Sequence, residues 1–98
     1  MEKYNVDDIN KNLQNCIGWE YKNNALQKAF TFKDFSEAFG FMTRVALIAE
    51  TLEHHPDWTN VYNKITIRLS THDAGGITEK DFGFVKKVEG LFTKEQAV

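Results

Sequence analysis

The stretch DFSEAFGFMTRVALIAETLEHHP, residues 34–56, predicts the longest helix of this chain, and the other elements can be placed around it. Its first four residues, DFSE, open the helix. Apolar residues then recur at helical spacing, at Phe35, Ala38, Phe39, Met42, Val45, Ala46, Ala49 and Leu52, with Phe41 and Ile48 widening the stripe. We expect Pro56 to end this helix, because the residue before a proline is pushed out of helical geometry.

Strand patterns flank the helix on both sides. Before it, residues 19–22 and 25–32 are typical of a hairpin, since the two asparagines between them tolerate the positive φ of a tight turn. After it, residues 65–70 alternate apolar and polar side chains, which predicts a half-buried strand. An adjoining strand is expected around residues 59–62.

Two capping boxes predict a helix before the first strand pair and another after the second. Residues 5–8, NVDD, open a helix that runs to about residue 15, and residues 78–81, TEKD, open the last one. The element order is therefore α-β-β-α-β-β-α. Hairpins favour antiparallel pairing, and amphipathic helices cover one face of such a sheet, so we predict a single two-layer α+β domain over residues 1–98.

The composition excludes several classes of protein. The 98 residues are 42% hydrophobic and 27% charged, as in an ordinary globular chain, and the net charge of -2 disfavours direct nucleic-acid binding. Cys16 is the sole cysteine, so no internal disulfide forms, which fits a reducing compartment. The N-terminal residues MEKYNVDDIN lack an apolar run, so we expect no signal peptide, no membrane span and a cytoplasmic location.

The candidate chemical groups are three histidines and two carboxylates. His54 and His55 are adjacent where the long helix ends, and His72 follows the end of a strand. Glu50 precedes His54 by four residues, which predicts that both lie on one side of the last helical turn. Asp81 lies in the first turn of the last helix.

Spacing alone leaves more than one interpretation of these residues. A histidine at a helix C-terminus complements the helix dipole, and capping explains Asp81 without any chemistry. Metal binding is disfavoured, because adjacent histidines diverge by roughly 100° on a helix, whereas helical metal pairs stand at i and i+4. Acid/base chemistry fits better, because imidazole titrates nearest to neutral pH and no nucleophile motif competes.

The histidines also belong to a longer pattern. Along the chain it is Glu50-x-x-x-His54-His55-Pro56, then Tyr62, His72 and Gly76-Ile77-Thr78-x-x-Asp81, with FGFMTRVALIAE at residues 39–50 before it. This pattern resembles that of the pterin-4a-carbinolamine dehydratases, and Trp19 and FTFKDF at residues 30–35 extend the similarity over nearly the whole chain. The resemblance implies a four-stranded antiparallel sheet with three helices packed on one face, in agreement with the element order.

The resemblance also implies an activity, the dehydration of 4a-hydroxytetrahydrobiopterin to quinonoid dihydrobiopterin and water. This hydro-lyase step would recycle tetrahydrobiopterin after aromatic amino acid hydroxylation. The family uses no metal and no bound cofactor, since the pterin is the substrate. By the same resemblance, His54 and His72 are the catalytic acid/base pair, and His55 completes the site by binding and orienting the pterin.

Three more residues are expected at the substrate site. The resemblance implies that Glu50 and Asp81 support the histidines, fixing their tautomers or raising their basicity. Trp19 would supply an aromatic wall for the flat pterin ring, or else be a core tryptophan at the start of a hairpin.

The resemblance implies a second role, of a different class. Vertebrate members of the family are dimerisation cofactors for a homeodomain transcription factor, hepatocyte nuclear factor, and residues 39–50 are the candidate surface. A homodimer or homotetramer interface explains the same wide apolar face, and we favour it because symmetric self-association is common. An aromatic amino acid hydroxylase is a further candidate partner, and the cofactor role would add a nuclear location.

Overall fold

The computed structural model describes the backbone of residues 2–96 and the side chains of residues 2–93. The elements, in chain order, are α1 (Val6–Leu13), β1 (Glu20–Lys22), β2 (Ala25–Thr31), α2 (Phe35–Leu52), β3 (Asp57–Val61), β4 (Lys64–Leu69), the short 3-10 helix η1 (His72–Ala74) and α3 (Glu79–Gln96). The predicted order of helices and strands is confirmed, and η1 is an addition that no sequence pattern indicated.

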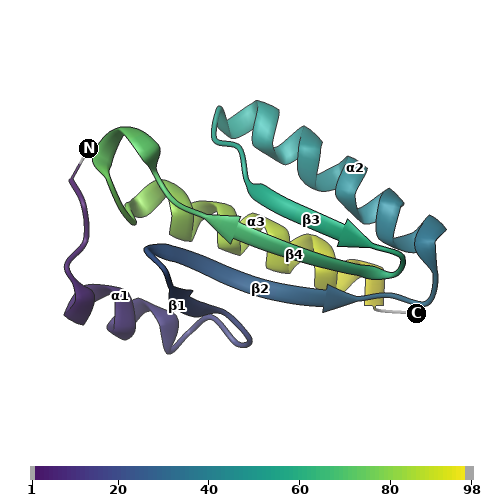
Figure 1. Ribbon diagram of the computed structural model, residues 1–98, viewed down its shortest axis with the longest axis horizontal. Helices are drawn as coiled ribbons and strands as arrows, with labels where there is room; N and C mark the ends of the chain where they lie inside the picture. The colour runs from purple at the N-terminus through teal and green to yellow at the C-terminus, as the bar shows by residue number, and fades with distance from the viewer. Residues whose placement is uncertain (1, 97–98) are drawn as a thin grey trace.

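The four strands form one antiparallel sheet in the order β1-β2-β4-β3 (Figure 1). The two hairpins therefore meet through their second strands, β2 and β4, with Leu26 opposite Leu69 and Phe30 opposite Ile65. In β3, which forms an edge of the sheet, Asp57 is opposite Arg68. This register fixes which side chains share a face at each end of the sheet.

One face of the sheet is buried under the helices, as predicted. Figure 1 shows α3 running behind the sheet, with α2 beside it and α1 near β1. A single core cluster joins side chains from the sheet and from all three helices, including Leu26, Phe30, Ile65, Ile67, Leu69, Ile9, Phe41, Val45, Phe84 and Val88. Apolar and polar residues alternate along β4, so its polar side chains lie on the opposite, uncovered face.

The predicted turn and cap chemistry is present in the structure. Asn23 and Asn24 both have positive φ, 51° and 59°, as a tight hairpin turn requires. The Asn5 side chain accepts a hydrogen bond from the Asp8 N–H at 2.8 Å, and the Asp34 side chain accepts one from the Glu37 N–H at 2.9 Å. Local sequence therefore sets where these elements begin.

The end of α2 differs from the prediction. The helix stops at Leu52, and Glu53 adopts the left-handed conformation with φ 52°, its N–H bonded back to the Ala49 and Glu50 carbonyls. Pro56 therefore comes after the helix has already ended. This early stop turns His54 and His55 out of the helical path. Within the described residues, no helix is long and apolar enough to cross a membrane.

Candidate active site

His54 and Asp81 form a buried pair that joins the end of α2 to the start of α3. His54 Nε2 lies 2.6 Å from Asp81 Oδ1, and the two residues are 8% and 0% exposed. The His54 ring packs edge-on to Phe84, with ring centroids 6.1 Å apart. Because the two residues are separated by 27 positions in the chain, only the folded protein brings them together.

The second oxygen of Asp81 is also satisfied. Oδ2 accepts the backbone N–H of Thr78 at 2.9 Å and the hydroxyl of Thr71 at 2.8 Å. The Thr78 hydroxyl lies 2.7 Å from that of Thr71 and accepts the Lys80 N–H at 3.2 Å. The predicted capping box is therefore present, but capping uses one carboxylate oxygen of Asp81 and leaves the other for His54.

This network assigns the proton on His54. In its ionised form the Asp81 carboxylate can only accept hydrogen bonds, so His54 Nε2 must donate. The neutral imidazole then carries its proton on Nε2, and Nδ1 is the nitrogen with a free lone pair.

Glu50 pairs with a different histidine from the one that the spacing predicted. His55 Nε2 lies 2.9 Å from Glu50 Oε1, and both side chains are largely exposed. Glu50 and His54 do not lie on one side of a helical turn, because Glu53 leaves the helix and His54 comes after its end. The Glu50 carboxylate can thus orient His55, while Asp81 orients His54.

His72 lies in η1, directly after Thr71. Its side chain is exposed, and its carbonyl accepts the Gly75 N–H at 3.0 Å. Among residues 2–93 the imidazole of His72 has no hydrogen-bond partner within the chain. The bond from Thr71 to Asp81 ties this segment to the buried pair, and His72 is the exposed residue that follows Thr71.

The adjacent histidines line two different hollows. His55 borders a cavity of about 260 Å³ on the uncovered side of the sheet, together with Asn23, Asn24, Ala25, Asp57, Arg68 and Ser70. His54 borders a hollow of about 330 Å³ between the end of α2 and the start of α3, with Leu52, Glu79, Lys80, Gly83 and Lys87. In the isolated chain the two imidazoles therefore border separate hollows.

Comparison with known proteins assigns the chain to a family. The model of the family pterin 4 alpha carbinolamine dehydratase matches residues 2–91. The chain belongs to this family.

Relatives and one solved structure agree with that assignment. A protein of Solibacter usitatus named "Putative pterin-4-alpha-carbinolamine dehydratase" is 48% identical, over 91% of this chain and 94% of the relative. A protein of the same name from Christiangramia forsetii is 44% identical, over 93% of this chain and 94% of its own length. A crystal structure described as a transcriptional coactivator/pterin dehydratase from Brucella melitensis has 39% identity and a TM-score of 0.89, covering 92% of this chain and 98% of the other.

Trp19 lies apart from the histidines. It is 6% exposed within the core cluster, edge-on to Phe30, and its indole N–H donates to Glu89 Oε2 at 2.9 Å. Lys28 donates to the same oxygen at 2.8 Å. These contacts satisfy both the ring and its polar atom, as expected for a core tryptophan at the start of a hairpin.

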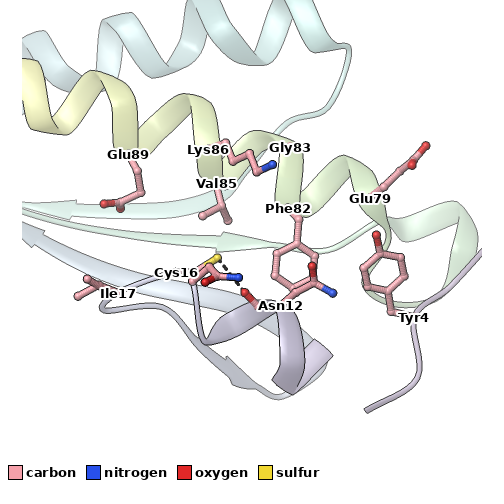
Figure 2. Close-up of a pocket in the computed structure, with 11 residues that line it drawn as sticks. Tyr4, Asn12, Cys16, Ile17, Glu79, Phe82, Gly83, Val85, Lys86 and Glu89 are labelled. Carbon is pink, nitrogen blue, oxygen red and sulfur yellow. Dashed lines mark hydrogen bonds between the residues drawn. The ribbon is translucent and has the colours of Figure 1, made fainter. Parts of the chain in front are cut away.

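A larger cavity, of about 560 Å³, lies between α1 and α3 and contains none of the predicted site residues (Figure 2). Tyr4, Cys16, Phe82 and Lys86 are among its lining residues. Burial raises the pKa of the Cys16 thiol above its ordinary value of 9.0, and the charge of Glu89 adds to this effect while that of Lys86 opposes it. The thiol is therefore protonated at neutral pH and a poor nucleophile.

No metal centre accompanies the histidines in the part of the chain that the structure describes. Within residues 2–93, no group of three or more histidine, cysteine, aspartate or glutamate side chains is arranged to hold an ion. The donor set around His54 is one imidazole, one carboxylate and two hydroxyls that already bond one another. These groups suit proton transfer better than metal coordination.

The sequence did not indicate a role for Thr71 in the site, and from local pattern it indicated only a capping role for Thr78. Both hydroxyls belong to the network that holds the Asp81 carboxylate. Arg68, which lines the cavity beside His55, was also missed. Its signal was the strand register, because residues opposite each other on one sheet face lie close together.

Proposed function

We propose that this chain dehydrates 4a-hydroxytetrahydrobiopterin to quinonoid dihydrobiopterin and water, recycling the pterin after an aromatic amino acid hydroxylase has used it. Family membership supports the reaction class. The assignment to these residues rests on the buried His54–Asp81 pair, which is held by Thr78 and by Thr71, the residue before the exposed His72. We expect the reaction to take place in the cytoplasm.

The chemistry requires two proton transfers. The C4a–O bond breaks, and the departing hydroxyl takes a proton to leave as water. The N5–H bond gives up its proton, and its electron pair forms the new C4a–N5 double bond. Hydroxide is a poor leaving group, so a positioned acid and a positioned base each accelerate such a step by about 10²- to 10⁴-fold.

The histidines can divide these tasks. In our proposal His54 is the base, because Asp81 holds its Nε2 proton and leaves Nδ1 to accept one. His72 is the acid, since its exposed imidazole is free to protonate the leaving hydroxyl. His55, oriented by Glu50, binds the pterin and positions C4a between them. His54 and His55 line different hollows of the isolated chain, so the proposal requires that the bound pterin reach both residues.

The decay of 4a-hydroxytetrahydropterin tests the proposal directly. The carbinolamine is generated by a hydroxylase and followed by its ultraviolet absorbance, with and without the purified protein. We expect accelerated decay that saturates with substrate. Uncatalysed decay in the presence of a sample shown to be folded by circular dichroism would refute the proposed function.

An exposed apolar face on α2 supports self-association. Phe35, Phe39 and Leu47 are 48%, 55% and 64% exposed, although they belong to the most apolar helix of the chain. The core-facing residues of this helix are instead Ala38, Phe41, Val45 and Ala49. We propose that a second copy of the chain covers this face, because a two-fold axis would set identical apolar surfaces against each other.

The mass in solution should reveal this association. We expect a dimer or tetramer by light scattering, and a smaller species for Phe39→Glu, since a buried charge at the interface is costly. Ile17→Glu is the matched control, because Ile17 is 86% exposed and lies outside α2. A monomeric wild-type protein at high concentration would leave the α2 face to another partner, such as the transcription factor suggested by the coactivator description of the Brucella melitensis relative.

A further inference from the structure

Two residues of opposite charge line the cavity beside His55, and they lie opposite each other on neighbouring strands. Asp57 of β3 and Arg68 of β4 are register partners, and both line the cavity of about 260 Å³. Directly opposed residues of an antiparallel pair have Cα atoms about 4.5–5.5 Å apart, so both side chains can reach one small molecule. His55 lines the same cavity and lies two residues before Asp57.

Arg68 is held in place by the first hairpin. Its Nη1 donates to Gln27 Oε1 at 2.9 Å, and its Nη2 donates to the Asn23 carbonyl at 3.3 Å. A guanidinium has five N–H donors in a rigid fork, so about three remain for a ligand. The half-buried side chain is thereby oriented before anything binds.

The Asp57 carboxylate is not used by any other group that the structure describes. Among residues 2–93 it has no hydrogen-bond or ion-pair partner, although its register partner is an arginine. Arg68 is directed to Gln27 and Asn23 instead. Asp57 is also exposed, so its two oxygens are available to donors from outside.

We propose that Asp57 and Arg68 bind the pyrimidine edge of the pterin and select for it. This edge presents a 2-amino group and N3–H, two parallel donors that match the two oxygens of one carboxylate. The adjacent 4-oxo group accepts a hydrogen bond from Arg68. The inference rests on the proposed function, and it places the 4a carbon, next to the 4-oxo carbon, toward the histidines.

Paired ligands that differ at one position test this recognition. Affinities for 7,8-dihydropterin and 7,8-dihydrolumazine, which has a 2-oxo group in place of the 2-amino group, are measured by fluorescence titration on wild type and Asp57→Asn. Wild type should prefer the pterin by about 10-fold or more, because each charge-assisted hydrogen bond contributes about 1.5–3 kcal/mol. An asparagine side chain offers one donor and one acceptor, which match the 2-oxo group and the N3–H of lumazine. The variant should therefore prefer lumazine to the pterin.

Kinetics and controls complete the test. Asp57→Asn and Arg68→Gln should each raise KM for the carbinolamine by about 10-fold while kcat at saturation stays within about twofold. Asp7→Asn, an exposed carboxylate on α1, should match wild type in every measurement. A folded Asp57→Asn protein with wild-type ligand preference and KM would overturn this inference alone. A wild-type protein that neither binds pterin nor accelerates carbinolamine decay would overturn the proposed function as well.

Discussion

Replacing His54 with alanine is expected to lower kcat for carbinolamine dehydration by about 10²- to 10⁴-fold, the contribution of one positioned acid or base. His54 is the imidazole whose tautomer a buried carboxylate determines, and the variant removes this oriented ring. Stopped-flow absorbance of enzymatically generated substrate gives kcat and KM separately. His55→Ala should mainly raise KM, because His55 is assigned to binding and has only an exposed carboxylate as partner.

Loss of the His54 ring also removes a partner from a buried carboxylate, so a folding defect must be separated from a catalytic one. His72→Ala serves this purpose, since His72 is exposed and its removal should leave the fold unchanged. We expect that variant to lose turnover by a similar factor while its urea unfolding midpoint stays at the wild-type value. Wild-type turnover in both the His54 and the His72 variants would contradict the acid/base assignment.

Replacing Asp81 with alanine should cost about 3–5 kcal/mol of the free energy of unfolding, as expected when one partner of a buried pair is removed. Asp81 is fully buried, and its carboxylate accepts from His54, from the Thr71 hydroxyl and from the Thr78 N–H. In the alanine variant these donors lose their acceptor in a dry environment. Urea unfolding followed by circular dichroism measures the loss.

Asp81→Asn separates stability from catalysis. The asparagine oxygen can still accept from Thr71 and Thr78, so much of the stability should remain. Its NH₂ group, however, would face His54 and donate to Nε2, which moves the imidazole proton to Nδ1. We expect a folded protein with strongly reduced kcat, and a tautomer change visible in the ¹⁵N NMR shifts of His54. Unchanged shifts with wild-type kcat would show that Asp81 has only a structural role.

The exposed pair Glu50–His55 is the natural comparison for the buried one. Its side chains are 78% and 62% exposed, so Glu50→Ala should change stability by about 0–1 kcal/mol, in contrast to Asp81→Ala. The two adjacent histidines thus pair with carboxylates whose expected contributions to the free energy of unfolding differ strongly. The difference arises from burial and not from the residue types.

Local signals in the sequence determined the elements of this protein. The asparagine pair with positive φ, the two capping boxes and the alternation in β4 are short-range patterns, and each marks an element at the place where the structure has it. The residues that carry the family pattern could likewise be identified without coordinates. Such patterns are reliable because they depend on backbone geometry within a few residues.

Only the tertiary structure decided how the site residues are paired. Glu53 in the left-handed conformation ends α2 early. As a result, Glu50 pairs with His55 and not with His54. The docking of α3 against the end of α2 brings the free oxygen of Asp81 to His54, and the register of β3 on β4 places Asp57 opposite Arg68. These contacts join segments that are distant in the chain, and their energies depend on burial, which no local pattern encodes.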